Sequence, residues 1–248
     1  MKNLTVRDYR YIIPNGVTSI GLTIGLVAIF LALKGHYVDA AWILLLCVLL
    51  DKLDGSLARL LDAGSAIGMQ LDSFSDFVTF CVAPGILAGA LMTQEGSPLS
   101  AFPSALMAYA SVVVYVISGA LRLARFNTIE DSGEGLKAFF SGVPTTLCGA
   151  LIMTALLTLN EHVLFIRYVL WLPALLVLCG LLMNSPVYLP KLSKRPRYRV
   201  ILWFQVFNFL VAPVLVIGHW FPEYLLSLVL VYVVVGLAWA NRPGVDIQ

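Results

Sequence analysis

Apolar runs long enough to cross a lipid bilayer follow one another along almost the whole chain. Each crossing of the roughly 30 Å hydrocarbon core takes about 20 apolar residues. Turn and charge signals divide the sequence into eight such runs, near residues 15–33, 39–59, 70–92, 102–122, 143–159, 165–183, 200–218 and 223–240. Because every backbone polar group inside lipid must be satisfied within the protein, such runs predict helices. The expected fold is an all-α, polytopic membrane bundle of about eight transmembrane helices.

The composition leaves no room for a separate soluble domain. Hydrophobic residues make up 60% of the 248 residues and charged residues only 12%, against roughly 45–50% and about 25% in a soluble domain. We therefore predict one integral membrane domain over residues 1–248. The net charge of +2 is too small for nucleic-acid binding through bulk charge, so no nucleic-acid partner is expected.

Positive charges alternate between two sets of loops. Lys and Arg gather in the N-terminal tail, in residues 122–137, in residues 191–199 and at Arg242, whereas the intervening loops carry only Lys34 and Arg167. The positive-inside rule then places both termini in the cytosol. The five cations of residues 191–199 are either a topology signal or an attraction for anionic membrane lipids.

Two pairs of glycines have the spacing at which membrane helices pack closely. Gly21 and Gly25 lie in the first span, and Gly85 and Gly89 lie in the third. Small residues four positions apart allow a second helix to approach the backbone. We expect close helix contacts at both pairs.

Four aspartates lie inside the second and third spans, where an ionised carboxylate without a partner costs about 2.5–3.5 kcal/mol. Asp51 and Asp54 are three residues apart, and Asp72 and Asp76 are four apart, so each pair shares one helix face. Since only a short segment joins the two spans, we expect antiparallel neighbours with their aspartates at similar depth. The four carboxylates should converge on one site.

The donor set of this site suits hard divalent cations. Four carboxylates at close range repel one another, and two divalent ions balance their charge. Oxygen ligands favour Mg²⁺ or Mn²⁺ over zinc, and His36, His162 and His219 fall in loops predicted on the opposite side. Gly55 and Ala58 leave room for a ligand on the same helix face. Two such cations with a nearby arginine indicate phosphate or pyrophosphate chemistry.

These residues also spell a known signature. They read Asp51-xx-Asp54-Gly55-xx-Ala58-Arg59, then eight residues, then Gly68-xxx-Asp72-xxx-Asp76. The pattern resembles that of the CDP-alcohol phosphotransferases, which join an alcohol to the phosphate of a CDP-linked donor and release CMP. The resemblance implies that Asp51, Asp54, Asp72 and Asp76 bind two metal ions.

The resemblance implies further roles. Asp76 would take the proton from the acceptor hydroxyl, although the residues themselves leave open that it is only a metal ligand. The site for the CDP donor would include Asn15, Thr18, Asp54, Gly55, Ala58, Arg59, Gly68 and Ser75. A homodimer in a prokaryotic cytoplasmic membrane, with its active site facing the cytosol, is also expected.

Three more stretches resemble the phosphatidylserine synthase branch of this family. They are Asp72-Ser-Phe-Ser-Asp76-Phe continuing to Val82-Ala-Pro84, Gly119-Ala-Leu-Arg122-Leu-Ala-Arg125-Phe-Asn127, and Phe140-Ser-Gly142-Val-Pro144. Arg122, Arg125 and Asn127 are candidates for binding the acceptor, because fixed cations hold carboxylates or phosphates. The alternative for the two arginines is a role as positive-inside anchors. One departure is Thr145-Thr146, where the branch usually has a second proline.

The branch implies transfer of a phosphatidyl group from CDP-diacylglycerol to L-serine, giving phosphatidylserine and CMP. Another acceptor, such as glycerol phosphate, an inositol phosphate or choline, stays open, as does an archaeal CDP-lipid donor. An ion-coupled transporter is a remote alternative, because intramembrane carboxylates also mark ion pathways. Carboxylates confined to two adjacent spans, with no counterpart in the second half, favour the enzyme.

Overall fold

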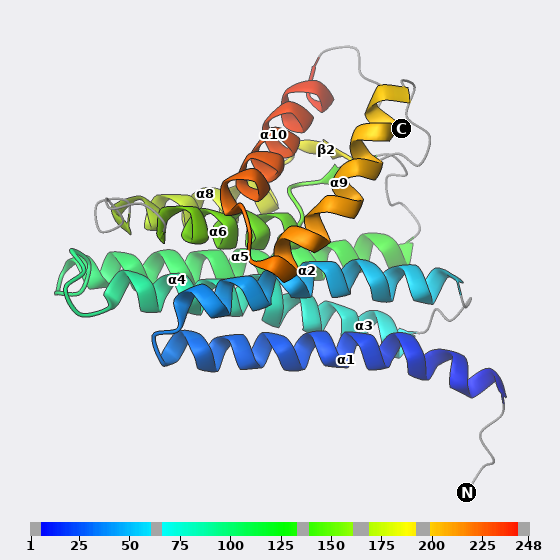
Figure 1. The fold of residues 1–248 in the computed structure, drawn as a ribbon, viewed down its shortest axis with the longest axis horizontal. Helices are drawn as coiled ribbons and strands as arrows, with labels where there is room; N and C mark the ends of the chain where they lie inside the picture. Colours follow the sequence, from blue (N-terminus) through cyan, green and yellow to red (C-terminus); the bar gives the residue numbers. More distant parts are fainter. Residues whose placement is uncertain (1–5, 61–65, 133–138, 161–168, 192–198, 243–248) are drawn as a thin grey trace, which may run out of the picture.

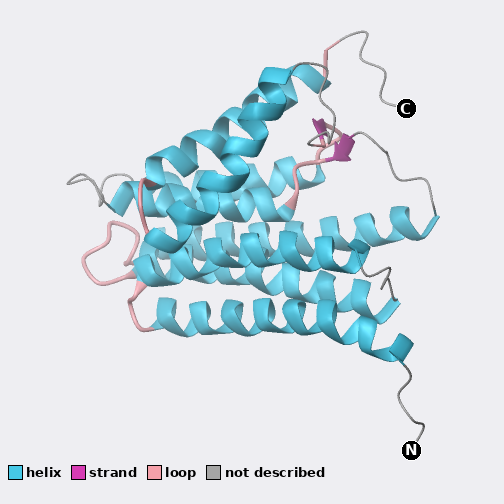
Figure 2. Ribbon diagram, turned by 45° about the vertical axis from the view of Figure 1, so that its right-hand side comes forward, coloured by secondary structure: helices cyan, strands magenta, loops and turns pink. Residues whose placement is uncertain are grey.

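The molecule is built almost entirely of helices (Figures 1 and 2). The computed structural model describes residues 6–60, 66–132, 139–160, 169–191 and 199–242. Its helices are α1 (Val6–Leu33), α2 (Tyr37–Leu60), α3 (Ala66–Asp76), the π-helix η1 (Phe77–Val82), α4 (Ala83–Thr93), α5 (Ser104–Ser132), α6 (Thr145–Asn160), the 3-10 turn η2 (Val169–Trp171), α8 (Leu172–Asn184), α9 (Arg199–Gly218) and α10 (Pro222–Ala240). Two short strands are β1 (Phe139–Ser141) and β2 (Tyr188–Pro190).

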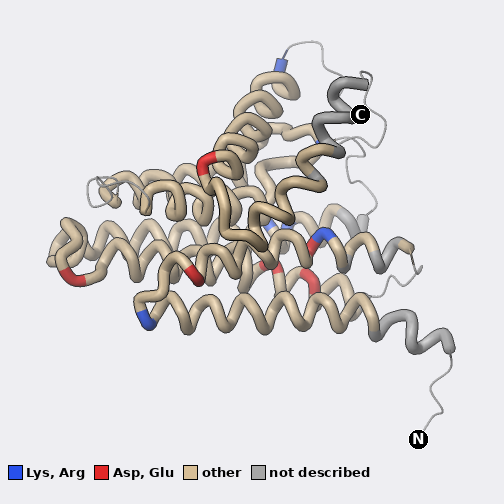
Figure 3. Tube along the Cα trace, in the orientation of Figure 1, with Lys and Arg blue, Asp and Glu red and all other residues tan. Residues whose placement is uncertain are grey.

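Each of the eight predicted spans overlaps a helical segment, with α3, η1 and α4 forming one continuous segment. Four stretches are long and apolar enough to cross a membrane, namely Ile13–Leu33, Ile67–Thr93, Ser104–Ile129 and Pro222–Ala240. Thr145–Asn160 and Val169–Asn184 are apolar but shorter. In Figure 3 the described helices carry few charges along their length. These properties support a multi-pass membrane protein.

Most of the helices run side by side, and α9 and α10 cross them obliquely (Figure 1). α1 packs along α2 and α3, α5 packs along α4 and α8, and α6 lies against α2 and α10. Leu44, Leu87, Tyr115 and Ile152 are fully buried where these helices meet. The core is therefore shared among α2, α4, α5 and α6.

The two glycine pairs make the predicted close contacts. A Cβ on Gly25 would lie 2.5 Å from the Thr79 methyl group, and one on Gly89 would lie 3.2 Å from a Val112 methyl group. A side chain at position 25 would displace Thr79, and one at position 89 would press on Val112. α1 thus lies directly on η1, and α4 lies directly on α5.

β1 and β2 form a small antiparallel sheet, which the expected all-α fold did not include. Phe139 pairs with Pro190, and Ser141 pairs with Tyr188. The sheet packs on α10, where the Tyr232 hydroxyl donates to the Pro190 carbonyl at 2.6 Å. Because the two strands lie far apart in the sequence, only tertiary packing brings them together.

The observed end of α5 corrects the predicted end of the fourth span. The sequence predicts a span over residues 102–122 followed by a loop, whereas α5 continues to Ser132. Tertiary contacts hold the added turns, since Arg125 donates to the Ser141 carbonyl and Asn127 donates to Ser73. Arg122, Arg125 and Asn127 consequently stand on a helix and have fixed directions.

Candidate active site

Three of the four signature aspartates converge where α2 meets α3. Carboxylate oxygens of Asp51, Asp72 and Asp76 lie within 4.8 Å of one another, and the three residues are half-buried. Asp51 comes from α2, whereas Asp72 and Asp76 are one turn apart on α3. The predicted convergence is confirmed for these three. Asp54 belongs to α2, but its side chain lies outside the described part of the structure.

A buried guanidinium stands beside this cluster. Arg122 is only 6% exposed and interacts electrostatically with Asp76. Its Nη1 donates to Thr145 Oγ1 at 3.5 Å, and its guanidinium carbon lies 5.8 Å from the centre of the Phe126 ring. Its Nε is buried without a hydrogen-bond partner among the described residues. This burial favours a binding role over that of a surface anchor.

The segment that leads into α6 is held by α5 and α8. Arg125 Nη2 donates to the Ser141 carbonyl at 3.3 Å. Gly142 has a φ of 74°, and a Cβ there would overlap the Met183 carbonyl, so the turn requires glycine. Two stretches that resemble phosphatidylserine synthases therefore meet, and they bring Thr145 to the buried arginine of α5.

Asn127 contacts the helix that carries two of the aspartates. Its Nδ2 donates to Ser73 Oγ at 2.9 Å, and Ser73 Oγ donates to the Met69 carbonyl at 3.0 Å. Ser73 directly follows Asp72. The bond ties the end of α5 to α3 at the edge of the carboxylate cluster, a contact that no sequence pattern predicted.

Two of the residues predicted to bind the CDP donor join α1 to α3. Thr18 and Ser75 are both buried, and Ser75 Oγ donates to the Thr18 carbonyl at 3.4 Å. Asn15 lies about one turn before Thr18 and is half-buried. A Cβ on Gly21 would lie 3.7 Å from Ser75 Oγ, so the two helices are in van der Waals contact here.

The other predicted donor residues lie on α2 and α3. Gly55 on α2 and Gly68 on α3 are half-buried. Ala58 and Arg59 belong to α2, and their side chains lie outside the described residues, as does that of Asp54. Their contribution to a nucleotide pocket stays a prediction.

His36 and His219 lie at the other end of α2. His36 directly precedes this helix, and the His219 ring stacks on Trp42 with 5.0 Å between ring centres. Asp51 is about 14 Å farther along the helix than Trp42. These two histidines are therefore away from the carboxylate cluster, as predicted, whereas His162 lies outside the described residues.

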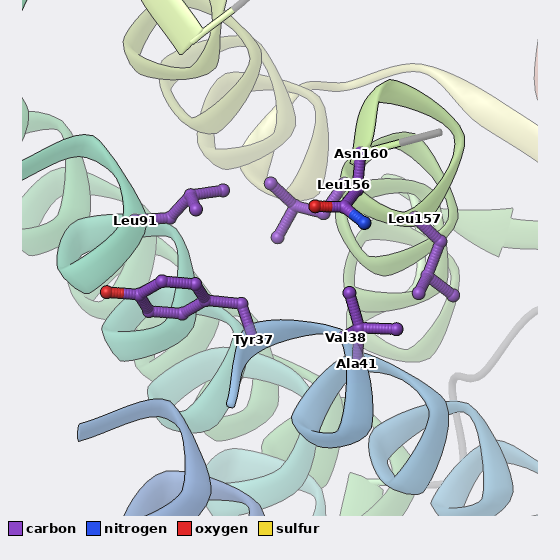
Figure 4. A pocket seen from close by; sticks show the side chains of 7 residues that line it. All are labelled: Tyr37, Val38, Ala41, Leu91, Leu156, Leu157 and Asn160. Atoms are coloured by element: carbon purple, nitrogen blue, oxygen red, sulfur yellow. The ribbon is translucent and has the colours of Figure 1, made fainter. Parts of the chain in front are cut away.

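A small hollow also opens at that end of α2 (Figure 4). Its lining residues come from α2, α4 and α6 and are Tyr37, Val38, Ala41, Leu91, Leu156, Leu157 and Asn160. None of them is a carboxylate or a cation. The hollow is therefore separate from the site of the aspartates.

Asp76 is followed directly by the π-helix η1, which no sequence pattern predicted. The Ala83 N–H donates to the carbonyl of Val78, five residues back. The residue that could have indicated an interruption of the α-helix is Pro84. Proline has no N–H to donate to the Phe80 carbonyl, and its ring would collide with that carbonyl in an α-helix. The wider π turn relieves this collision. Such turns are frequent at functional sites.

Residues 11–188 match the family model for CDP-alcohol phosphatidyltransferases. The match covers well over half of the chain and includes the carboxylate cluster. The protein belongs to the CDP-alcohol phosphatidyltransferase family. It is therefore an enzyme, and the alternative of an ion-coupled transporter is excluded.

Several relatives of this phosphatidyltransferase carry the name CDP-diacylglycerol–serine O-phosphatidyltransferase. The protein of that name from Helicobacter pylori is 30% identical over 192 residues, which are 74% of each chain. The one from Methanocaldococcus jannaschii is 30% identical over 236 residues, 95% of this chain and 94% of the relative. The one from Mycobacterium tuberculosis is 35% identical over 152 residues, 60% of this chain and 50% of the relative.

The carboxylate cluster fits a metal site of a CDP-alcohol phosphatidyltransferase. Its ligands are oxygens only, as hard divalent cations prefer. Among the described side chains, Arg122 interacts electrostatically with Asp76. Divalent cations bound to the three carboxylates would offset their mutual repulsion.

Proposed function

We propose that the protein transfers the phosphatidyl group of CDP-diacylglycerol to L-serine, giving phosphatidylserine and CMP. The observation that carries the proposal is the cluster of Asp51, Asp72 and Asp76 beside a buried arginine in a chain of this family. Serine as the acceptor is supported by the names of the relatives, including one that aligns with 95% of this chain.

The carboxylates have two tasks in this proposal. Asp51, Asp54, Asp72 and Asp76 hold two divalent cations, Mg²⁺ or Mn²⁺, which when bound neutralise the diphosphate of the donor. Asp76 accepts the proton of the serine hydroxyl. The hydroxyl oxygen forms a bond to the phosphorus that carries diacylglycerol. The bond from that phosphorus to the oxygen shared with the CMP phosphate breaks, and CMP leaves with that oxygen.

Arg122 is the proposed partner of the serine carboxylate. It is fixed beside Asp76, and its Nε has no partner among the described residues. A guanidinium matches the planar geometry of a carboxylate. Arg125 and Asn127, also proposed at the acceptor site, would hold the surrounding backbone through the Ser141 carbonyl and Ser73.

The proposed site faces the cytosol of a cytoplasmic membrane. The excess of Lys and Arg in the N-terminal tail, in residues 191–199 and at Arg242 supports this orientation. The homodimer implied by the family resemblance stays a prediction.

The deciding experiment is CMP release by the purified protein in detergent. CDP-diacylglycerol and Mn²⁺ are supplied with L-serine, glycerol phosphate, an inositol phosphate or choline in separate reactions, and an archaeal CDP-lipid replaces the donor in a parallel series. We expect release with CDP-diacylglycerol and serine only. Release with a different alcohol would reject serine, and no release with any acceptor, by protein that binds the donor, would reject the transfer itself.

Metal removal tests the role of the carboxylates. Treatment with EDTA should abolish CMP release, because the carboxylates alone cannot neutralise the diphosphate. Mg²⁺ or Mn²⁺ should restore release, and CMP is quantified before and after each addition. Full activity in EDTA would contradict the proposed metal site.

A further inference from the structure

The π-helix η1 contains a backbone carbonyl that an α-helix would leave without a donor. The α-helical partner of the Phe80 carbonyl would be the nitrogen of Pro84, which carries no hydrogen. The Tyr115 hydroxyl of α5 donates to this carbonyl at 2.6 Å. Tyr115 is 0% exposed and Phe80 is 1% exposed. The hydroxyl therefore supplies the donor that Pro84 cannot.

Glycines let the neighbouring helices close on η1. A Cβ on Gly149 of α6 would lie 3.1 Å from the Phe80 oxygen and 3.3 Å from its Cα. A Cβ on Gly119, one turn after Tyr115 on α5, would overlap Cys81 Sγ. η1 is thus packed closely between α5 and α6.

The same face of α5 reaches both η1 and the carboxylate cluster. Tyr115, Gly119 and Arg122 follow one another at intervals of four and three residues, which places them in one row on the helix. Tyr115 bonds to η1, and Arg122 interacts with Asp76, the residue that directly precedes η1. α5 therefore interacts both with Asp76 and with the π-helix that follows it.

We propose that Tyr115 is a positioning residue for Asp76. Its hydroxyl holds η1 in register, and η1 in turn holds the Asp76 carboxylate against Asp51 and Asp72. Loss of the hydroxyl would release the Phe80 carbonyl and displace Asp76 from the cluster. The inference rests on the role of Asp76 in the proposed function.

The test compares two tyrosine-to-phenylalanine variants. Tyr115→Phe removes only the hydroxyl that reaches η1. Tyr232→Phe is the matched control, because its hydroxyl also donates to a backbone carbonyl at 2.6 Å, that of Pro190, away from the carboxylate cluster. Each variant and the wild type are titrated with Mn²⁺ alone, with binding followed by electron paramagnetic resonance. Kinetics of CMP release and thermal unfolding are measured on the same samples.

We expect Tyr115→Phe to weaken Mn²⁺ binding and to lower kcat, each by between about tenfold and about a hundredfold, as small displacements of catalytic groups do. KM for the CDP-lipid at saturating Mn²⁺ should change by less than about twofold, because the donor-binding residues are untouched. Tyr232→Phe should bind Mn²⁺ and turn over like the wild type, with at most a lower unfolding temperature.

Wild-type Mn²⁺ affinity and kcat in Tyr115→Phe would overturn the inference, even if that variant unfolds earlier. Failure of the wild type to bind Mn²⁺ or release CMP would instead overturn the proposed function, so the two failures are distinguishable. If Tyr115→Phe cannot be purified in folded form, Gly149→Ala tests the second step of the inference, that a displaced η1 disturbs the carboxylate cluster, by pushing on Phe80 from α6. Weaker Mn²⁺ binding in that variant supports the inference, and unchanged binding overturns it.

Discussion

Asp76 is the residue at which the proposed chemistry can be tested most directly. It lies at the end of α3, shares the cluster with Asp51 and Asp72, and faces Arg122. Asp76→Asn keeps the size of the side chain and removes its basicity. We expect CMP release to fall by at least about a hundredfold, the usual contribution of a general base. Binding of the CDP-lipid at saturating Mn²⁺, measured by equilibrium titration, should largely survive.

Asp72→Asn is the matched control for this variant. Asp72 is a metal ligand but not a base in the proposed mechanism. A higher Mn²⁺ concentration should therefore restore part of the activity of the Asp72→Asn variant. Recovery of Asp76→Asn by Mn²⁺ to the same extent would make Asp76 a ligand only. Substantial activity of Asp76→Asn at the Mn²⁺ concentration used for the wild type would exclude Asp76 as the base.

Arg122 and Arg125 are predicted to differ, although the sequence presents them as a pair. Arg122 is buried beside Asp76, whereas Arg125 donates to the Ser141 carbonyl. Arg122→Ala should raise KM for the acceptor by between about tenfold and about a hundredfold, because a buried charged hydrogen bond is lost. KM for the CDP-lipid should change much less. Steady-state kinetics with each substrate varied in turn measures both.

The paired variant Arg125→Ala should act mainly on stability, because the Arg125 side chain donates to a backbone carbonyl, that of Ser141. A similar rise in the acceptor KM for both variants would assign Arg125 to the acceptor as well. Equal rises for acceptor and donor in Arg122→Ala would contradict a specific role at the acceptor.

At the residue scale, the sequence predicts the carboxylate site well and its surroundings poorly. Asp51, Asp72 and Asp76 are predictable because carboxylates inside spans need partners and because their spacing selects one helix face. The contact of Asn127 with Ser73 and the bond of Tyr115 to η1 join residues that are far apart in sequence. No local pattern encodes such contacts.

At the scale of elements, the turn between β1 and α6 is predicted to be the most sensitive to a single methyl group. Gly142 has a φ of 74°, and a Cβ there meets the Met183 backbone, which cannot rotate away. Gly142→Ala should therefore lower the free energy of unfolding by about 2 kcal/mol or more. Thermal unfolding in detergent measures the loss.

Gly96→Ala separates backbone strain from steric overlap. Gly96 has a similar φ of 83°, but a Cβ there meets nothing within 4 Å. We expect Gly96→Ala to lower the free energy of unfolding by only about 1 kcal/mol, which is the strain of the left-handed conformation. An equal decrease in the free energy of unfolding of Gly142→Ala and Gly96→Ala would mean that the Met183 backbone moves away from the new methyl group without destabilising the fold.

Hydropathy predicts where the helices lie because the bilayer sets the length of a span. It does not predict where a helix ends once it leaves the apolar run, as α5 shows by continuing to Ser132. It also gives no tilt, since packing sets the angle at which α9 and α10 cross the other helices. It likewise does not predict that β1 pairs with β2, because both strands lie between the predicted spans.

At the scale of the whole molecule, the predicted orientation can be tested by labelling introduced cysteines. Lys34 and Arg242 are both exposed and lie on loops predicted on opposite sides of the membrane. A membrane-impermeant maleimide should label Lys34→Cys in intact cells and Arg242→Cys only after permeabilisation. The native cysteines Cys47, Cys81, Cys148 and Cys179 are buried, so background labelling should be low. The opposite pattern would invert the proposed orientation.

The π turn at η1 also has an evolutionary consequence. Pro84 has no N–H to donate to the Phe80 carbonyl, and the Tyr115 hydroxyl donates to that carbonyl instead. The hydroxyl at position 115 therefore compensates for the proline at position 84. A homologue with any other residue at position 84 regains the N–H and loses the need for a hydroxyl at position 115. The two positions should therefore covary across the family, although they lie on different helices.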